Sequence, residues 1–174
     1  ACLNANDPLK DMRMVLQECK DMGVNSVSNI GPSISYVDKD SEIYNVLTST
    51  GVTLQNEIDM LKLAREEMDM VSIGLAFTKE DSLAIVEGAR PHIFCYHAGT
   101  TKGGLTGYDN GSTIADTAAE SEDVYAAVRK IDPNVILVGH GAAMETPEDA
   151  QYMLDNTTGH GFWTGSSTER LPIE

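Results

Sequence analysis

Two histidines stand at equivalent places in the sequence, each at the end of an apolar run and before small residues. His97 closes HIFCYH and leads into AGTTKGG, and His140 closes VILVGH and leads into GAA. Imidazole titrates near neutrality and can act as a general acid or base, a metal ligand or a donor to an anion. We therefore predict that both side chains reach one site and carry catalysis. The alternative is that each histidine only hydrogen-bonds its own loop.

Small residues follow the last two apolar runs, at the place where barrel proteins commonly bind phosphate. Backbone N–H groups in these segments could close on an anion, and the alternative is that the small residues serve only tight turns. Arg170 could bind a carboxylate through two nitrogens, unless it forms an ion pair with Glu169. The small residues concerned are Gly139, Gly141, Ala142, Gly165 and Ser166.

Helices and strands alternate along the chain. A helix is expected from the Asp7-Pro8 cap to Gly23, with further helices around residues 43–47, 58–68, 78–88 and 114–131 and from Thr146-Pro147 onward. The expected strands cover residues 24–30, 71–77, 92–96, 135–138 and 161–164, with the tail of another before Asp7. Because the strands are apolar throughout and no hairpin signal joins them, they predict a parallel sheet covered on both faces, and hence an α/β fold.

The length narrows the choice among parallel α/β folds. A complete (β/α)8 barrel needs about 250 residues, and the glycine motifs of dinucleotide-binding and Walker-loop proteins are absent from the sequence. The expected strands fit a TIM barrel that lacks its beginning and its last helix. We therefore predict a single, partial barrel domain over residues 1–174.

The charge balance excludes some partners. The chain has 12 Lys plus Arg against 27 Asp plus Glu, a net charge of −15, which repels nucleic acids and anionic membranes. No apolar run approaches the roughly 18 residues of a membrane helix. The cysteines at positions 2, 19 and 95 lack metal-type spacing and are expected to be free thiols of a reducing compartment. We expect a cytoplasmic protein with no nucleic-acid or membrane partner.

Six segments together resemble one protein family. They are DPLKDM (7–12), NEIDMLKLARE (56–66), YHAGTTKGG (96–104), GHGAA (139–143), TPEDAQYMLD (146–155) and HGFWTGSSTERLP (160–172). In this order they resemble the phosphoenolpyruvate hydrolase-like family of TIM-barrel proteins, within the phosphoenolpyruvate/pyruvate superfamily. The resemblance implies that about two strands precede Ala1 and a closing helix follows Glu174. Since uncovered strands expose unpaired edges, we expect a homo-oligomer or a part of a larger chain or assembly.

The resemblance also implies a function and its residues. The implied activity is that of a hydrolase or lyase acting on a small phosphorylated or 2-oxo acid such as phosphoenolpyruvate or phosphonopyruvate. The implied catalytic residues are His97, His140 and Asp7. The implied substrate-binding residues are Asn29, Thr100, Thr101, Gly103, Gly104, Gly141, Ser166, Ser167, Glu169 and Arg170. Ala142 and Gly165 complete the predicted substrate site as small residues of the loops described above.

The sequence departs from the family pattern at some of these positions. The segment SNIGPSISYVD replaces a usual asparagine-phenylalanine-proline run and retains Asn29 with different spacing. GHGAAME replaces a histidine-glycine-glycine-proline run, and Lys102 replaces a glycine. Superfamily enzymes hold Mg²⁺ through acidic residues at strand ends, but only Asp7 is a well-placed carboxylate here, so the metal and the cofactor stay open, with Mg²⁺ as the candidate.

Two alternative functions remain at the level of sequence. One is a non-catalytic, ligand- or nucleotide-binding regulatory barrel within a larger protein or assembly, because fold does not fix function. The other is a metal-dependent lyase of the aldolase type, whose activity a chelator would abolish. The small anionic metabolite expected as ligand also requires locally positive potential on an acidic chain.

Overall fold

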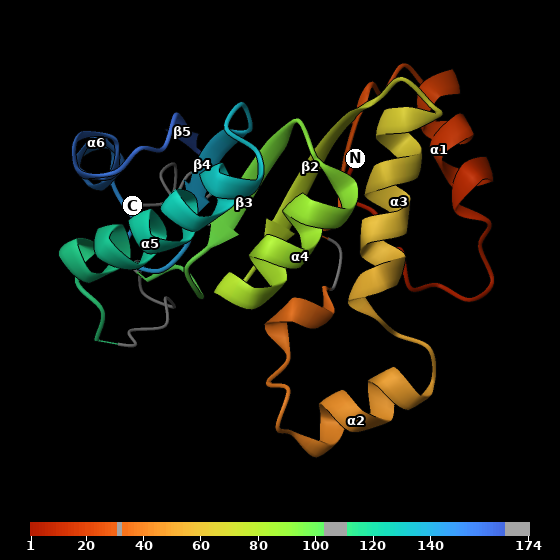
Figure 1. Cartoon of the computed structure of the whole chain (residues 1–174), viewed down its shortest axis with the longest axis horizontal. Helices are drawn as coiled ribbons and strands as arrows, with labels where there is room; N and C mark the ends of the chain where they lie inside the picture. The colour runs from red at the N-terminus through yellow and green to blue at the C-terminus, as the bar shows by residue number, and fades with distance from the viewer. Residues whose placement is uncertain (31–32, 103–110, 166–174) are drawn as a thin grey trace, which may run out of the picture. The chain divides into compact units, whose positions relative to one another are not determined.

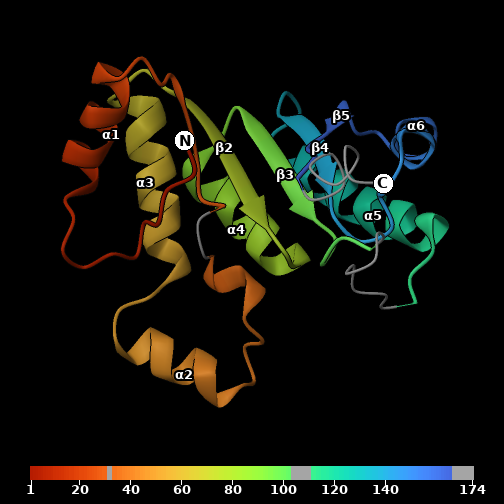
Figure 2. The ribbon, with the colours of Figure 1, turned by 180° about the vertical axis from the view of Figure 1, so that it is seen from behind.

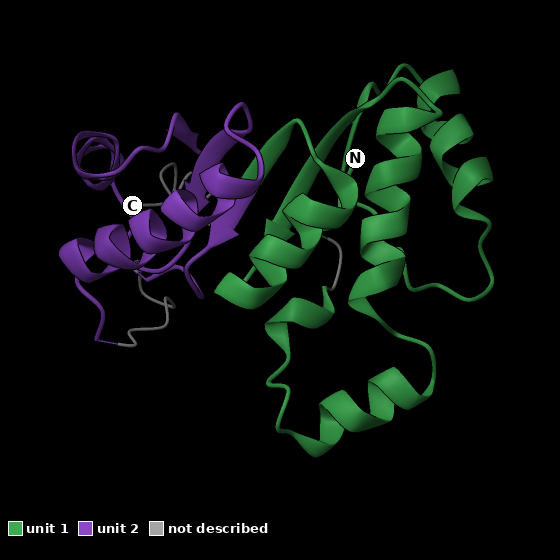
Figure 3. Ribbon diagram, viewed as in Figure 1, with its two compact units in different colours: residues 1–94 green, residues 95–174 purple. Residues whose placement is uncertain are grey.

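The computed structural model describes residues 1–30, 33–102 and 111–165. The chain divides into two compact units, residues 1–94 and 95–174 (Figure 3). In the described part, five parallel strands alternate with helices, and the strands hydrogen-bond in the order in which they occur along the chain. The predicted parallel α/β architecture is therefore present.

The first unit carries two parallel strands covered by helices. β1 (Ser26–Ser28) pairs with β2 (Val71–Ala76) in the register Ser26 to Val71. α3 (Leu54–Glu66) and α4 (Lys79–Ala89) pack against β2 and lie in front of the strands in Figure 1 and behind them in Figure 2. Residues 1–3 add a parallel bridge to β1, between Cys2 and Ser28, which confirms the strand tail expected before Asp7.

One hydrophobic cluster of the first unit lies between α1 (Met12–Asp21), β1 and α3. Leu16 and Val27 are completely buried there, and so is Ala64. Cys19 belongs to the same core as a free thiol, and burial of apolar side chains supplies most of the driving force for folding.

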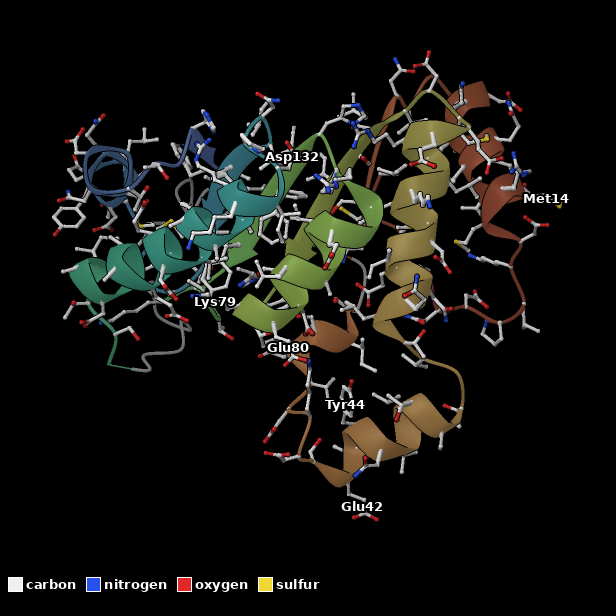
Figure 4. All side chains as sticks on the ribbon, viewed as in Figure 1. Met14, Glu42, Tyr44, Lys79, Glu80 and Asp132 are labelled. Carbon is white, nitrogen blue, oxygen red and sulfur yellow. The ribbon has the colours of Figure 1, made fainter. Side chains whose placement is uncertain are left out.

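One short helix of the first unit stands away from this core. The turn η1 (Ile34–Tyr36) leads to α2 (Glu42–Ser49), which has no buried residue. Figure 4 labels Glu42 and Tyr44 on this helix. No helix in the described ranges is long and apolar enough to span a bilayer.

The second unit contains the last two strands and the helices around them. β3 (Ile93–His97) starts in the first unit and ends in the second, and α5 (Ile114–Ile131) follows it. β4 (Ile136–His140) pairs in parallel with β5 (Gly161–Phe162), and α6 (Pro147–Asn156) connects them. α5 and α6 each begin with a capping box, Thr113 with Asp116 and Thr146 with Asp149, in which side chain and backbone satisfy each other's polar groups.

The start of the first helix differs from the sequence prediction. α1 begins at Met12, because the Asp11 carboxylate accepts hydrogen bonds from the backbone N–H groups of Arg13 and Met14 at 2.8 and 3.3 Å. Asp7 caps a preceding turn instead, where it accepts from Leu9 N–H at 3.0 Å. The cap predicted at Asp7-Pro8 is therefore wrong, since the chain turns before the helix starts.

Candidate functional site

The two histidines singled out by the sequence are the last residues of their strands. His97 ends β3 and His140 ends β4. Their ring centroids lie 4.4 Å apart, and the ring planes meet at 85°, edge to face. Parallel α/β proteins bind ligands at the carboxyl ends of strands, so this pair marks the candidate site.

Backbone hydrogen bonds connect the loops that follow these two strands. Ala98 N–H donates to the His140 carbonyl, and Ala142 N–H donates to the Gly99 carbonyl, both at 2.9 Å. Gly141 has a φ of +85°, and a Cβ there would overlap the Gly99 carbonyl oxygen and come within 2.8 Å of the His97 ring. Glycine is therefore required at position 141 for the close approach of the two loops.

The environment of His97 keeps its imidazole neutral. The N–H of Gly99 donates to Nδ1 at 3.2 Å, so Nδ1 carries a lone pair. Burial and, to a smaller extent, the charge of a protonated His140 beside it together lower the pKa of His97 to about 3. His97 is thus neutral at physiological pH, with its remaining proton on Nε2.

The opposite nitrogen is protonated in His140. Its Nδ1 lies 2.5 Å from the carbonyl oxygen of Trp163, which can only accept a hydrogen bond. Nδ1 therefore carries a proton, and in the neutral ring Nε2 is the acceptor. The two imidazoles of the pair have opposite tautomers, each set by one backbone group.

A pocket of about 120 Å³ opens beside His140. Its wall comes from the end of β4, the loop into α6, the first turn of α6, and the segment at β5. Met144 and Trp163 contribute to this wall, and Glu145 is its acidic residue. None of these three residues is among those predicted from the sequence, although the loops that hold them follow predicted strand ends.

Several predicted substrate-binding residues lie at this site. Thr101 and Gly141 line the pocket together with His140. Gly165 lies against the same imidazole, because a Cβ placed on it would be 3.4 Å from Cε1 of His140. The structure thus brings these residues together, and their roles in binding stay predictions.

Two further predicted residues, Thr100 and Ala142, follow β3 and β4 but are not among the residues that line the pocket. Thr100 is exposed. Ala142 is buried in the left-handed region at a φ of 49°, and its N–H already donates to Gly99. That N–H is therefore engaged within the protein rather than directed at an anion. Six predicted residues lie outside the described residues: Gly103, Gly104, Ser166, Ser167, Glu169 and Arg170.

The remaining predicted residues, Asp7 and Asn29, belong to the first unit. Asp7 forms an ion pair with Lys10 at 3.8 Å in addition to its turn. Asn29 is buried, and its amide donates to the Leu75 carbonyl and accepts from Leu75 N–H at 2.9 and 2.8 Å. The Asn29 side chain therefore bonds to the backbone of β2.

Asn29 also reaches the buried carboxylate of Glu57 near the start of α3. Glu57 accepts from the Asn29 amide at 2.6 Å, from the Ser33 hydroxyl at 2.8 Å and from Ile34 N–H at 2.9 Å. Burial raises the pKa of Glu57, and these hydrogen bonds partly offset the rise. This network connects α3 to the segment after β1.

The described residues do not fit a magnesium site. Within residues 1–30, 33–102 and 111–165, no three His, Cys, Asp or Glu side chains are grouped so that they could hold a metal ion. Asp7, the one carboxylate the sequence offered, already has Leu9 N–H and Lys10 as partners. No catalytic step is therefore derived through Mg²⁺.

The fold and the site together define a parallel α/β protein with a histidine pair and a pocket at the carboxyl ends of its strands. The family model described as phosphoenolpyruvate hydrolase-like matches residues 1–174, and the chain belongs to this family. This confirms the resemblance drawn from the sequence.

Two curated relatives come from Solanum lycopersicum. They are the ToMV susceptible protein tm-1(GCR26) and the ToMV resistance protein Tm-1(GCR237). Each is 30% identical to this chain over 171 residues, which cover 98% of the chain and 22% of the relative. The chain therefore spans about a fifth of the length of the curated relatives it matches.

Proposed function

We propose that this protein is a hydrolase or lyase that acts on a small 2-oxo or phosphorylated acid at the carboxyl ends of β3 and β4, and that its strands belong to a (β/α)8 barrel. The observation that carries the proposal is His140, whose Nε2 is the acceptor nitrogen and which lines a pocket. The family to which the chain belongs supports the class of substrate.

The two histidines have different roles in this proposal. His140 takes a proton at Nε2 from an attacking water or a substrate hydroxyl and returns it to the leaving group. His97 has a pKa lowered to about 3, so its imidazole stays neutral and acts as a hydrogen-bond donor through Nε2. Its ring also packs edge to face against the ring of His140. This division narrows the sequence prediction, in which both histidines did acid–base work.

The charge around the pocket favours the less highly charged member of the substrate class. Among the described residues that line it, none is Lys or Arg, and Glu145 is acidic. The partial positive charge at the start of α6 is opposed by the carboxylates of Glu148 and Asp149 in its first turn. A singly charged 2-oxo acid suits this balance better than a phosphorylated acid, which carries more negative charge.

Replacement of His140 by Asn tests the catalytic role. The Asn amide can still donate to the Trp163 carbonyl but has no nitrogen in place of Nε2. We expect turnover of the active acid, found by screening pyruvate derivatives, phosphoenolpyruvate and phosphonopyruvate, to fall about 10²- to 10⁴-fold. The melting temperature should stay unchanged. His92→Asn is the matched control. His92 stands directly before β3, at the opposite end of the strand from His97, and accepts a hydrogen bond from the N–H of Ser72. Undiminished turnover in His140→Asn would remove the proposed role.

A second candidate function is a non-catalytic ligand- or nucleotide-binding module of a longer chain or an oligomer. The observation that favours it is that the curated relatives are longer and that their names describe susceptibility or resistance to ToMV rather than a reaction. Binding of a nucleotide or metabolite, seen as a raised melting temperature, with no turnover of any acid in the screen would support this candidate.

A further inference from the structure

The pocket beside His140 is largely apolar on the side of α6 and β5. Met144 and Ala150 are buried in its wall at 8% and 5% exposure, and Pro147 stands between them in the chain. Phe162 and Trp163 line it from β5 and the residue after it. Polar atoms come from His140, Glu145 and the threonines at positions 101, 146 and 164. Such a wall suits a hydrocarbon group.

The size of the pocket exceeds what the smallest substrates of the proposed class would fill. Its volume is about 120 Å³, close to the roughly 150 Å³ of an engineered apolar cavity that binds benzene in another protein. The methyl group of pyruvate would leave most of this volume empty. Unfilled apolar volume forfeits dispersion contacts on every side, so a larger group is favoured.

The charged residues of the pocket wall determine where the anionic head group of a ligand can lie. Glu145 lies at the end of the pocket next to α6, and the carboxylate of Asp149 accepts from the N–H groups of Glu145 and Thr146 at 3.2 and 3.0 Å. The two backbone N–H groups just before α6 are thus already satisfied by a carboxylate. An anionic head group is disfavoured there and is directed to His140 instead.

We propose that this pocket is a specificity subsite that takes the hydrocarbon side chain of a 2-oxo acid, with the acid's reacting carbon at His140 and its side chain between Ala150, Met144 and Trp163. The proposal rests on the proposed function and narrows its substrate class to acids with a branched or aromatic group in place of the methyl of pyruvate. Trp163 connects the subsite with the reacting end of the ligand. It lines the subsite, and its backbone carbonyl accepts the hydrogen bond from Nδ1 of His140.

A series of 2-oxo acids that differ only in the side chain tests the subsite. Dissociation constants of pyruvate, 2-oxobutanoate, 2-oxopentanoate and 4-methyl-2-oxopentanoate are measured by calorimetry and by the fluorescence of Trp163, the one tryptophan of the 174 residues. We expect affinity to rise about fourfold with each added methylene, the factor that corresponds to about 0.8 kcal/mol per buried CH₂.

A blocking variant and a matched control locate the effect. Ala150→Leu fills the subsite from α6, so it should abolish the gain in affinity with chain length. Gln151→Leu introduces the same side chain at the next, exposed position of α6 and should keep the gain. Melting curves of both variants show that each is folded.

The outcomes separate this inference from the proposed function. Affinity that is flat along the series, or a gain that survives in Ala150→Leu, would overturn the subsite, while turnover of phosphoenolpyruvate or phosphonopyruvate would uphold the reaction. A gain that Ala150→Leu abolishes, with no turnover of any acid, would establish the subsite and overturn the hydrolase or lyase. Absence of binding by every acid in the series, together with no turnover of phosphoenolpyruvate or phosphonopyruvate, would overturn both.

Discussion

Trp163 holds two consecutive residues of β4 through its backbone: its N–H donates to the Gly139 carbonyl at 2.8 Å, and its carbonyl accepts from His140 Nδ1 at 2.5 Å. The residue directly after β5 therefore sets both the position and the tautomer of His140 at the end of β4. A backbone carbonyl on one imidazole nitrogen directs the other nitrogen toward chemistry, as in many histidine sites. The histidine pair is thus oriented by backbone groups on both sides, Gly99 for His97 and Trp163 for His140.

Gly141 lies where the loops after β3 and β4 meet, and its replacement by Ala should separate them. The new Cβ overlaps the Gly99 carbonyl oxygen and crowds the His97 ring, and the φ of +85° is itself unfavourable for Ala. Gly111→Ala is the matched control, because Gly111 has a φ of +79° and nothing within 4 Å of its Cβ position.

In Gly111→Ala we expect only the backbone cost, about 1 kcal/mol. In Gly141→Ala we expect a loss of unfolding free energy larger by about 1 to 3 kcal/mol, the usual range for overpacking. Urea unfolding of both variants measures the difference. Equal losses would mean that the loops separate without cost and that the close contact at Gly141 contributes nothing.

Replacement of the buried Glu57 by Gln should destabilise the protein. Its Oε1 accepts from Ile34 N–H, and its Oε2 accepts from Asn29 and Ser33. Either orientation of a Gln side chain therefore puts an NH₂ group against a donor, at Ile34 or at Asn29. Because a buried unsatisfied donor costs about 1 to 3 kcal/mol, Glu57→Gln should lower the free energy of unfolding by that amount.

The control for this substitution is Glu42→Gln, which makes the same chemical change in the exposed first turn of α2. We expect its unfolding free energy to stay within about 0.5 kcal/mol of the parent protein. A stable Glu57→Gln protein would show that the carboxyl is protonated and shares its hydrogen bonds differently, with Oε2 as a donor to Ser33.

Sequence reasoning placed the elements and the histidine pair because both depend on local patterns. The apolar runs before His97 and His140 became β3 and β4, each ending at its histidine, and parallel strands bring such ends to one edge. The cap of α1 was misplaced because Asp7 and Asp11 are equally good caps by type. Packing decides between them, since Leu16 is buried and Leu9 is 93% exposed.

What the sequence could not provide are contacts between distant positions. The network of Glu57 with Asn29 joins residues 28 apart, and the bond from His140 to Trp163 joins residues 23 apart. The tautomers follow from such bonds and from burial, neither of which has a periodic signature in a sequence. The pocket depends on them too, because Met144 and Trp163 are near each other only after β4 and β5 pair.

His160 shows how a histidine at the opposite end of a strand differs from the pair. It stands directly before β5, and its Nδ1 accepts from Leu137 N–H at 2.9 Å, as His92 before β3 accepts from Ser72 N–H at 3.1 Å. Replacement of His160 by Ala leaves the Leu137 donor without its acceptor. We expect a loss of about 1 to 3 kcal/mol in unfolding free energy with unchanged binding of 2-oxo acids. Calorimetry that showed weakened binding in this variant would bring His160 into the site.

The lowered pKa of His97 makes the stability of the protein depend on pH. The ordinary pKa of 6.5 applies in the unfolded chain, and the folded value is about 3, so between these two values the unfolded chain binds the extra proton. Stability is therefore fully present above about pH 6.5 and is lost as pH falls toward 3, with a slope of at most about 1.4 kcal/mol per pH unit from this group. Glu57 acts in the opposite sense, because its raised pKa makes stability fall as pH rises through and above 4.5.

His97→Asn separates the two groups. The Asn carbonyl can still accept from Gly99 N–H, but the side chain does not titrate. Urea unfolding from about pH 4 to about pH 8 should show the acid-side loss in the parent protein and a flatter profile in the variant, with the contribution of Glu57 retained. If parent and variant lose stability in parallel below pH 6.5, His97 accepts a proton in the folded protein, and the division of roles that makes His140 the proton-transfer residue is wrong.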